Sequence, residues 1–311
     1  MPTPVPGPGE VLIRAHAIGV CMPEVLVRRG EYYWMPPLPT IPGIEMSGIV
    51  EAIGEGVTSI ECGSPVFVSA RELPHRSGCY AEYRTAPAEA VYRLPAAVDL
   101  DAAACLSNYQ VAWHLLHSAT RGMPFETVLV PAAAGGVGSA IVQLARVAGK
   151  QVLGVVSSPE KAAFAERMGA KASINHRTED VTSRVKALTN GAGVDLILDP
   201  VGGPGTLAQF DRLAPFGMLI HYGMLAGWAS GDLLGALKPR FADCLAFRTF
   251  SMHAFDADRT QRRNATEALI ALLADRCLQP PIHTRLPLAD AARAHTMLES
   301  GTVLGKLLLK P

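Results

Sequence analysis

We predict an α/β protein in which a β-rich domain is split around an inserted, doubly wound domain with a parallel sheet. The 311-residue chain has short β-rich stretches broken by Gly and Pro up to Asp99. From Glu126 onward, apolar strands alternate with helical stretches, which is typical of a parallel sheet. After Ser251, one amphipathic helix and a short mixed tail close the chain. We therefore expect domain boundaries at 1–103, 104–245 and 246–311, with the first and last parts forming one domain.

The first part contains few helical signals before Leu100. Asp99 is a residue type favoured at helix N-caps and precedes a run of helix-forming residues. Turn residues such as Gly54 and Gly56 separate the earlier β-rich stretches. We expect these strands at Val11–Ala15, Gly48–Ala52 and Pro65–Ser69.

Strands and helices are expected to alternate along the inserted domain, and one helix is expected in the tail. The predicted strands are Thr127–Pro131, Gln151–Ser157, Ala172–Ile174, Val194–Asp199 and Met218–Tyr222. The predicted helices are Ile141–Ala148, Pro159–Met168, Asp180–Thr189 and, in the tail, Arg263–Asp275.

Composition argues against several classes of protein. The 28 Lys and Arg balance the 28 Asp and Glu, so there is no surplus of positive charge for nucleic acid. With 49% hydrophobic and 18% charged residues the chain can bury a large core, yet no apolar run is long enough to span a bilayer. The N-terminus lacks the pattern of a signal peptide, and the six cysteines form no C-x-x-C pair. We expect a soluble, cytoplasmic protein that binds neither nucleic acid nor membrane.

One loop has the pattern of a dinucleotide site. Ala133, Gly135 and Gly138 form an A-x-G-x-x-G motif between a predicted strand and a predicted helix. Small residues there let the backbone approach a pyrophosphate, and the helix N-terminus supplies free N–H groups. Glycines also make ordinary turns, but the surrounding strand and helix favour a cofactor site. The expected cofactor-binding residues are Ala134, Gly135, Gly136, Val137 and Gly138.

The next strand indicates which dinucleotide is bound. An NAD site usually has an acidic residue about 20 residues after the glycines, to bind the ribose 2′-hydroxyl. Here the strand ends at Ser157 and Ser158, with Lys161 shortly after. Hydroxyl groups and an ammonium suit a 2′-phosphate, so we expect NADPH. Glu160 beside Lys161 weakens this argument, and the alternative is that Lys161 is an ordinary solvated residue.

Several segments stand out by their order and spacing along the chain. They include Pro6-Gly-Pro-Gly-Glu, Ile41-Pro-Gly-Ile-Glu-Met-Ser-Gly, the Gly-rich loop, Gly193-Val-Asp-Leu-Ile-Leu-Asp-Pro-Val-Gly-Gly and Gly305-Lys306. Together they resemble the quinone oxidoreductase branch of the medium-chain dehydrogenase/reductase superfamily. The resemblance implies a GroES-like catalytic domain split around a Rossmann domain, and zinc-independent reduction of quinones or activated alkenes by NADPH. Only five residues precede Pro6, so the usual first strands of the GroES-like domain are expected to be missing.

Zinc-dependent members of this superfamily hold a catalytic zinc with Cys, His and Cys. Cys21 lies in the context of the first ligand. Ile44 stands where the His is expected, and no thiol lies at Ser107, near the position of the third ligand. Zinc requires several N or S ligands at one point. We therefore expect no metal.

Reduction of an activated alkene needs a positioned substrate, stabilisation of the developing enolate oxygen and a proton donor. Tyr32 resembles the pocket Tyr of the family and is the first candidate for binding or protonating the substrate. An aromatic run follows it in the chain. The alternative is that this aromatic cluster only covers the core. Cys21 replaces an Asn that many relatives carry. It is either a small buried residue or a redox-sensitive thiol, and the run Val20-Cys-Met-Pro-Glu supplies no cation to activate it.

The resemblance implies further site residues. Asn108 is expected to face the cofactor or substrate, and His176 to lie near the adenosine phosphate. His221 is expected to be structural, since no spacing pairs it with a carboxylate. The remaining implied cofactor-binding residues are Gly223, Met224, Phe250, Met252 and Lys306.

These observations lead to one principal function and two alternatives. We expect an NADPH-dependent, zinc-independent reductase of a quinone or an α,β-unsaturated carbonyl compound, acting as a homodimer. An enoyl-thioester reductase of polyketide or lipid assembly stays open. A dinucleotide-binding protein without turnover also stays open, because of the short N-terminus and Cys21.

Exhaustive chelation should leave the activity unchanged, because Ile44 and Ser107 remove two of the three zinc ligands. Elemental analysis of the purified protein should find less than one zinc per chain. Stoichiometric zinc that is lost in a Cys21→Ser variant would contradict this prediction.

Overall fold

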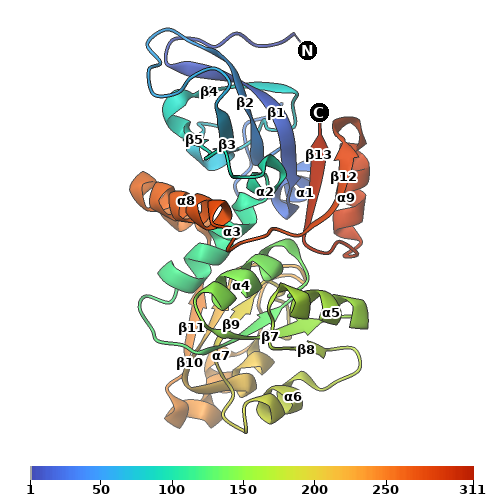
Figure 1. Cartoon of the computed structure of the whole chain (residues 1–311). Helices are drawn as coiled ribbons and strands as arrows, with labels where there is room; N and C mark the ends of the chain where they lie inside the picture. Colours follow the sequence, from blue (N-terminus) through green and yellow to red (C-terminus); the bar gives the residue numbers. More distant parts are fainter. Residues whose placement is uncertain (1) are drawn as a thin grey trace. The chain divides into compact units, whose positions relative to one another are not determined.

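The computed structural model describes residues 2–311, which divide into two compact units (Figure 1). Unit 1 consists of the chain up to Gln110 together with Asp256–Pro311, and unit 2 is Val111–Phe255. The predicted α/β fold, a β-rich part split around a parallel-sheet part, is confirmed. The units change at residues 110 and 255, where the sequence places boundaries at 103 and 245.

Unit 1 is built on a seven-stranded sheet. Its order is β12-β13-β1-β2-β3-β5, and β4 also pairs with β1. The pairs are antiparallel except β12 with β13, which run parallel. The strands are β1 (Glu10–Val20), β2 (Glu45–Ile53), β3 (Pro65–Ser69), β4 (Tyr83–Pro87), β5 (Val91–Arg93), β12 (Ile282–Pro287) and β13 (Lys306–Lys310).

The secondary structure of unit 1 differs from the prediction in two places. Helix α1 (Met22–Arg29) was not expected, although Glu24 lies in its first turn and Gly30 ends it in the left-handed conformation. The tail, which was expected to be short and mixed, contains β12, β13 and a second helix, α9. The expected N-cap is confirmed, because Asp99 Oδ1 accepts a hydrogen bond from Ala102 N at 2.9 Å. The other helices are α2 (Leu100–Ala103), α3 (Leu106–Trp113), α8 (Arg259–Ala274) and α9 (Ala291–Glu299).

Unit 2 is built on a six-stranded, wholly parallel sheet. Its order is β11-β10-β9-β6-β7-β8, and α4 and α5 pack against β7. The strands are β6 (Thr127–Pro131), β7 (Gln151–Val156), β8 (Ala172–Asn175), β9 (Val194–Asp199), β10 (Leu213–His221) and β11 (Ala246–Thr249). The helices are α4 (Gly136–Val147), α5 (Pro159–Met168), α6 (Val181–Leu188) and α7 (Leu233–Leu237).

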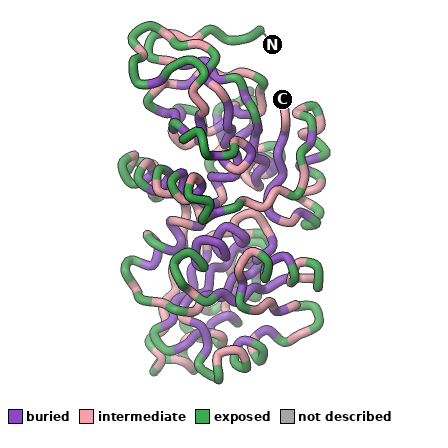
Figure 2. The backbone as a smooth tube through the Cα atoms, viewed as in Figure 1, coloured by how far each residue is buried: buried purple, intermediate pink, exposed green. Residues whose placement is uncertain are grey.

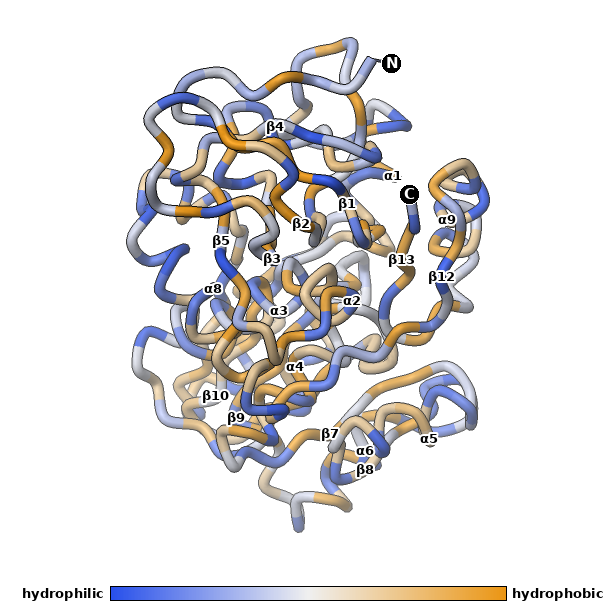
Figure 3. Tube along the Cα trace, turned by 45° about the horizontal axis from the view of Figure 1, so that its top comes forward, coloured by the Kyte–Doolittle hydropathy of each residue, from blue (hydrophilic) through white to orange (hydrophobic). Residues whose placement is uncertain are grey.

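Each unit has its own apolar core. Strand β13 supplies Leu307 and Leu309 to the core of unit 1 and is coloured hydrophobic in Figure 3. In unit 2, Leu129, Leu153 and Ile197 from neighbouring strands are buried (Figure 2). Within residues 2–311, no helix has both the length and the apolar character needed to cross a membrane.

Asp195 fixes the start of β6 against the start of β9 at the centre of the parallel sheet. Its Oδ2 accepts hydrogen bonds from Glu126 N at 2.8 Å, and from Thr127 N and Thr127 Oγ1 at 2.9 Å each. Hydrogen bonds to a charged acceptor are stronger than those between neutral groups.

Asp195→Ala should therefore lower the free energy of unfolding by about 1–3 kcal/mol, because three donors lose a charged acceptor. Urea denaturation measures this loss. Asp211→Ala, at an exposed position of the same unit, serves as the control and should change stability by less than about 0.5 kcal/mol. Equal effects of the two variants would contradict the structural role of Asp195.

Candidate functional site

The loop between β6 and α4 has the close packing that a pyrophosphate site requires. A Cβ atom at Gly138 would lie 2.3 Å from the carbonyl oxygen of Ala132, so only glycine fits. Gly135 is the N-cap of α4, and Gly136 and Val137 in its first turn are partly exposed. Because the first N–H groups of a helix have no acceptor within it, this exposed turn can bind an anion. The residues present therefore fit a dinucleotide pyrophosphate.

The residues expected to hold a 2′-phosphate lie together at the carboxyl ends of β7 and β8. Lys161 Nζ lies 3.0 Å from Ser157 Oγ, and Ser158 caps α5 by accepting from Lys161 N. His176 is exposed and donates its backbone N–H to the carbonyl oxygen of Val156 at 3.0 Å. Two hydroxyl groups, an ammonium and an imidazole therefore come from adjacent strand ends, which fits a phosphate.

Strands β9 and β10 bring together a pair that sequence spacing did not reveal. His221 and Asp199 are opposite each other in the parallel register, and His221 Nδ1 lies 3.5 Å from Asp199 Oδ2. His221 therefore does have a carboxylate neighbour, although no sequence spacing indicated one, and its expected structural role stays a prediction. Burial raises the pKa of Asp199, but hydrogen bonds from His221 and from the N–H groups of Val201 and Gly202 outweigh it and hold that pKa below its usual value. Asp199 thus organises the turn after β9.

The other residues expected near the nicotinamide have unequal exposure. Gly223 follows β10, and a Cβ atom there would lie 2.6 Å from the carbonyl oxygen of Pro200. Phe250 N donates to the carbonyl oxygen of His221 at 2.9 Å, so this residue follows the end of β10 closely. Met224 and Phe250 are partly exposed, whereas Met252 is buried. Cofactor contact by these residues stays a prediction.

A buried group of charged and polar side chains in unit 1 contains two of the residues singled out from the sequence. Lys306 Nζ lies 2.5 Å from Glu45 Oε1 and 2.7 Å from Cys21 Sγ. Asn108 Oδ1 lies 3.9 Å from the same sulfur. Glu45, Lys306 and Cys21 are 0%, 3% and 6% exposed. We call Cys21, Glu24, Glu45 and Lys306 the Lys306 cluster.

The backbone around the Lys306 cluster leaves space for the ion pair between Lys306 and Glu45. Lys306 begins β13 and Glu45 begins β2, while β1 lies between these two strands in the sheet. Gly19 of β1 has no side chain at this point, since a Cβ there would lie 2.3 Å from Glu45 Oε1. The other carboxylate oxygen of Glu45 accepts from Ser107 N at 2.7 Å. Both oxygens of the buried carboxylate thus have partners.

Glu24 is the second buried acid of the Lys306 cluster. Its oxygens accept from the N–H groups of Cys21 and Ile44, each at 3.1 Å. Burial raises the pKa of Glu24 to about 7, although Lys306 and backbone hydrogen bonds, including that from Ile44, oppose the rise. Burial also lowers the pKa of Lys306, but its interactions with Cys21 and with the Glu45 carboxylate outweigh this effect and raise that pKa overall. The ammonium is therefore charged, and Glu24 exchanges its proton near neutral pH.

The surroundings of Cys21 differ from those predicted from the sequence. No cation adjoins it in the chain, yet the fold places Lys306 beside its sulfur. Burial nevertheless raises the pKa of the Cys21 thiol well above its ordinary value, against the effect of Lys306. A protonated, buried thiol is a poor nucleophile. The reading of Cys21 as a small buried side chain is thus the one favoured by its geometry.

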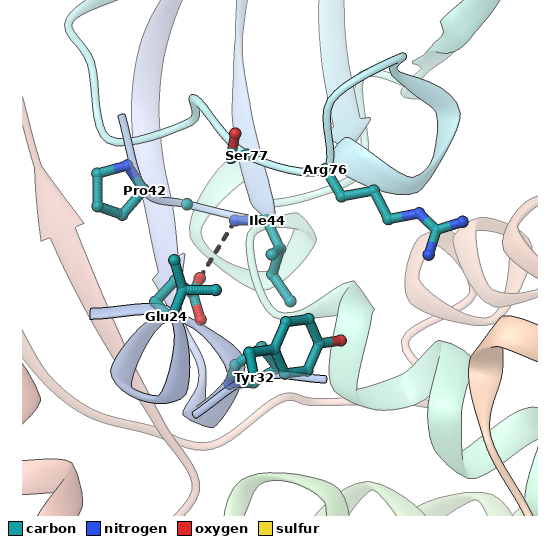
Figure 4. Close-up of a pocket in the computed structure, with 9 residues that line it drawn as sticks. Glu24, Tyr32, Pro42, Ile44, Arg76 and Ser77 are labelled. Carbon is teal, nitrogen blue, oxygen red and sulfur yellow. Dashed lines mark hydrogen bonds between the residues drawn. The ribbon is translucent and has the colours of Figure 1, made fainter. Parts of the chain in front are cut away.

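Tyr32 lies in a separate pocket of unit 1, which we call the Tyr32 pocket (Figure 4). The pocket is small and encloses room for about one water molecule. Tyr33 and Trp34, the other aromatic residues of the run, are 77% and 40% exposed. Burial raises the pKa of the Tyr32 hydroxyl, while Arg71 and Arg76 oppose the rise. The lining includes Glu24, Tyr32, Pro42, Ile44, Arg76 and Ser77.

The surroundings of Cys21 do not suit a catalytic zinc. Ile44 offers only its backbone N–H to Glu24, and Ser107 offers its N–H to Glu45. The Lys306 ammonium already lies beside the sulfur, and a second cation there would be repelled. In the part of the chain that the structure describes, no group of three His, Cys, Asp or Glu side chains has an arrangement that could hold a metal ion.

Comparison with known proteins covers almost the whole chain. Residues 7–96 match the family described as alcohol dehydrogenase GroES-like domain, and residues 136–250 match that described as zinc-binding dehydrogenase. A quinone oxidoreductase of Pseudomonas aeruginosa is 34% identical over 98% of this chain and 92% of its own. A 2-haloacrylate reductase of Burkholderia sp. is 31% identical, with 98% and 92% of the two chains covered. The crystal structure of Escherichia coli quinone oxidoreductase complexed with NADPH has a TM-score of 0.87 and 30% identity, and the match covers 100% of this chain and 94% of that one.

Sequence reasoning missed the residues that surround the expected ones. Glu24, Glu45 and Lys306 meet Cys21 only through the pairing of distant strands, although the Gly-Ile-Glu triplet at residues 43–45 is a usable signal for Glu45. Arg71 lies in a short 3-10 helix after β3 and Arg76 in the loop that follows it, and neither belongs to a motif.

Glu24→Gln should make stability depend less on pH, because Glu24 is the buried acid whose pKa is raised. The folded wild type binds a proton more tightly than the unfolded chain, so its stability is greatest below about pH 4.5 and falls as pH rises through about 7. Relative to the variant, the wild type should lose about 2–3 kcal/mol between pH 5 and pH 8. Urea denaturation of both proteins across this range measures the difference. A constant difference would show that Glu24 does not titrate there.

Proposed function

Because the chain belongs to the quinone oxidoreductase branch of the medium-chain dehydrogenase/reductase superfamily and is an NADPH-dependent oxidoreductase, we propose that it reduces a quinone or an α,β-unsaturated carbonyl compound by direct hydride transfer. NADPH, when bound, supplies the hydride, which adds to the β-carbon of the enone. The likeness to a 2-haloacrylate reductase supports an activated alkene as the substrate.

The observation that carries this proposal is the combination of the β6–α4 loop with the cationic ends of β7 and β8. The Gly138 backbone and the first turn of α4 would hold the pyrophosphate. Ser157 and Lys161 would hold the 2′-phosphate that distinguishes NADPH from NADH. Unit 2 therefore supplies the cofactor-binding residues of the proposed enzyme.

In unit 1, Tyr32 is the proposed donor to the substrate carbonyl. Because its pKa is raised, the phenol keeps its proton at neutral pH and can donate to the oxygen on which negative charge develops. Arg71 and Arg76 oppose the rise, whereas Glu24 and Asp256 add to it. Tyr32 thus combines a held proton with charged neighbours of both signs.

In the proposed enzyme, the Lys306 cluster positions Cys21 and stabilises unit 1. Cys21 keeps its proton and makes no covalent adduct, and Asn108 lies beside it. We propose a zinc-independent reaction, supported by the Lys306 ammonium beside Cys21. Lys306 was expected to contact the cofactor, and this role stays a prediction, because its ammonium is buried against Glu45.

We further propose a cytoplasmic homodimer that binds only small-molecule substrates. Strand β11 is an edge of the parallel sheet, and Leu234 and Phe241 in the preceding segment are 79% and 87% exposed. An open edge and exposed apolar side chains favour association with a second copy.

The proposed reaction is tested by assaying NADPH oxidation with a quinone, a simple enone and an enoyl thioester. Turnover of the quinone or the enone supports the proposal. Turnover of the thioester alone would favour an enoyl-thioester reductase. Tight NADPH binding with no turnover of any compound would favour a binding role.

Lys161→Ala should weaken NADPH binding about 10-fold or more while leaving NADH binding nearly unchanged, because it removes one charge from the 2′-phosphate site. Fluorescence titration of both cofactors measures this selectivity. Lys171→Ala, which removes an exposed lysine of the same unit, is the matched control. Equal weakening of NADPH and NADH by Lys161→Ala would refute the phosphate contact.

A further inference from the structure

The strand order of unit 2 indicates which segments are available to the nicotinamide half of NADPH. Strand β6 leads into the pyrophosphate loop, and the residues that fit the 2′-phosphate follow β7 and β8 on one side of it. A dinucleotide that crosses β6 from that side continues over β9 and β10, which lie on its other side (Figure 1). Ligands of parallel sheets bind at the carboxyl ends of the strands. The segments that follow β9 and β10 are therefore those that the nicotinamide half reaches.

These two segments, residues 200–203 and 222–227, continue the pairing of the sheet beyond its strands. A Cβ atom at Gly202 would lie 2.3 Å from the carbonyl oxygen of Gly227, so the two backbones are in direct contact. The position of one segment therefore determines the position of the other. The backbone hydrogen bonds between them include those from Tyr222 N to Asp199 O at 2.9 Å, from Ala226 N to Val201 O at 2.8 Å and from Gly203 N to Gly227 O at 2.9 Å.

Asp199, the last residue of β9, holds the first of these segments with its side chain. Its Oδ1 accepts a hydrogen bond from Val201 N at 2.9 Å. Its Oδ2 accepts from Gly202 N and from Thr206 Oγ1, each at 3.3 Å. Asp199 and Thr206 are both fully buried, so water does not compete for these bonds. Because hydrogen bonds to a charged acceptor are stronger than those between neutral groups, the carboxylate fixes the turn after β9.

His221, the last residue of β10, connects this carboxylate to the second segment. Its side chain is buried, and Nδ1 lies 3.5 Å from Asp199 Oδ2. Within residues 2–311, no other residue provides a hydrogen-bond partner for this nitrogen. The ring also lies against the first segment, since a Cβ atom at Gly202 would be 2.9 Å from His221 Cε1. The imidazole therefore contacts both the acid and the turn that the acid holds.

We propose that Asp199 and His221 are positioning residues for the nicotinamide half of NADPH. They hold residues 200–203 and 222–227 together at the carboxyl edge of the sheet, so that these backbones meet the nicotinamide and its ribose in one fixed arrangement. The inference rests on the proposed placement of NADPH on unit 2. It goes beyond that placement because both side chains are buried and act through the two segments. The adenosine half, over β7 and β8, does not depend on this pair.

The test compares NADPH with 2′,5′-ADP, which keeps the adenosine, the 2′-phosphate and one phosphate of the pyrophosphate but lacks the nicotinamide half. Calorimetry gives the ratio of the Kd of 2′,5′-ADP to the Kd of NADPH, which should be about 10 or more in the wild type. His221→Leu should lower this ratio about 5-fold or more, because it removes the partner of the buried carboxylate. His221→Asn, which retains a nitrogen near the position of Nδ1, should restore part of it. His117→Leu, the same substitution at an exposed position of unit 2, should leave the ratio unchanged.

A role in stability alone gives a different result. His221→Leu would then weaken the binding of both ligands equally and leave the ratio unchanged, which overturns the inference. If this variant does not fold, Thr206→Val takes its place. It removes another donor to Asp199 with little change of shape and should also lower the ratio. Thermal unfolding shows whether each variant is folded, and an unchanged ratio in folded Thr206→Val overturns the inference.

The binding measurement also separates this inference from the proposed reaction, because it needs no turnover. A ratio that falls in His221→Leu, in a protein that reduces no quinone or enone, supports the inference and refutes the reaction. Normal reduction with an unchanged ratio refutes the inference alone. A wild-type ratio near 1, or no binding of either ligand, overturns the inference as well.

Discussion

The buried ion pair of Lys306 and Glu45 is the constraint on which the sheet of unit 1 depends. It joins the first residue of β13 to the first residue of β2, and it passes β1 at Gly19. Burying a charged side chain this completely costs several kcal/mol unless the charge is paired and hydrogen-bonded. The strand order β13-β1-β2 and the Ser107 N–H supply these partners, so the sheet and the ion pair each require the other.

Most of the regular structure could be predicted because its signals are local. Strands β3, β6 and β9 and helix α5 begin and end at the expected residues, where apolar runs are bounded by Gly, Pro or polar residues. Helix α1 was missed because it has only eight residues and includes Pro23, which is tolerated in a first turn. The strands of the tail were missed because β12 and β13 are short and are held by pairing with one another and with β1.

The two halves of the candidate site differed in predictability for a physical reason. The β6–α4 loop is continuous in sequence, and each of its glycines satisfies a local requirement of the backbone. The environment of Cys21 is set by Lys306, which is 285 residues away, and no local pattern contains that contact. The charge of the Tyr32 pocket likewise comes from Arg76 and Asp256, 180 residues apart in the chain.

The long separation in sequence between Glu45 and Lys306 has a consequence for synthesis on the ribosome. Unit 2 is continuous from Val111 to Phe255 and has its own core, so all of its residues are available before the last strand emerges. Glu45 is synthesised early, but its counter-ion follows 261 residues later. Until then, burying this carboxylate would leave it without its counter-ion, so the β2 end of the sheet must stay hydrated. Completion of unit 1 is thereby delayed until β13 has been synthesised.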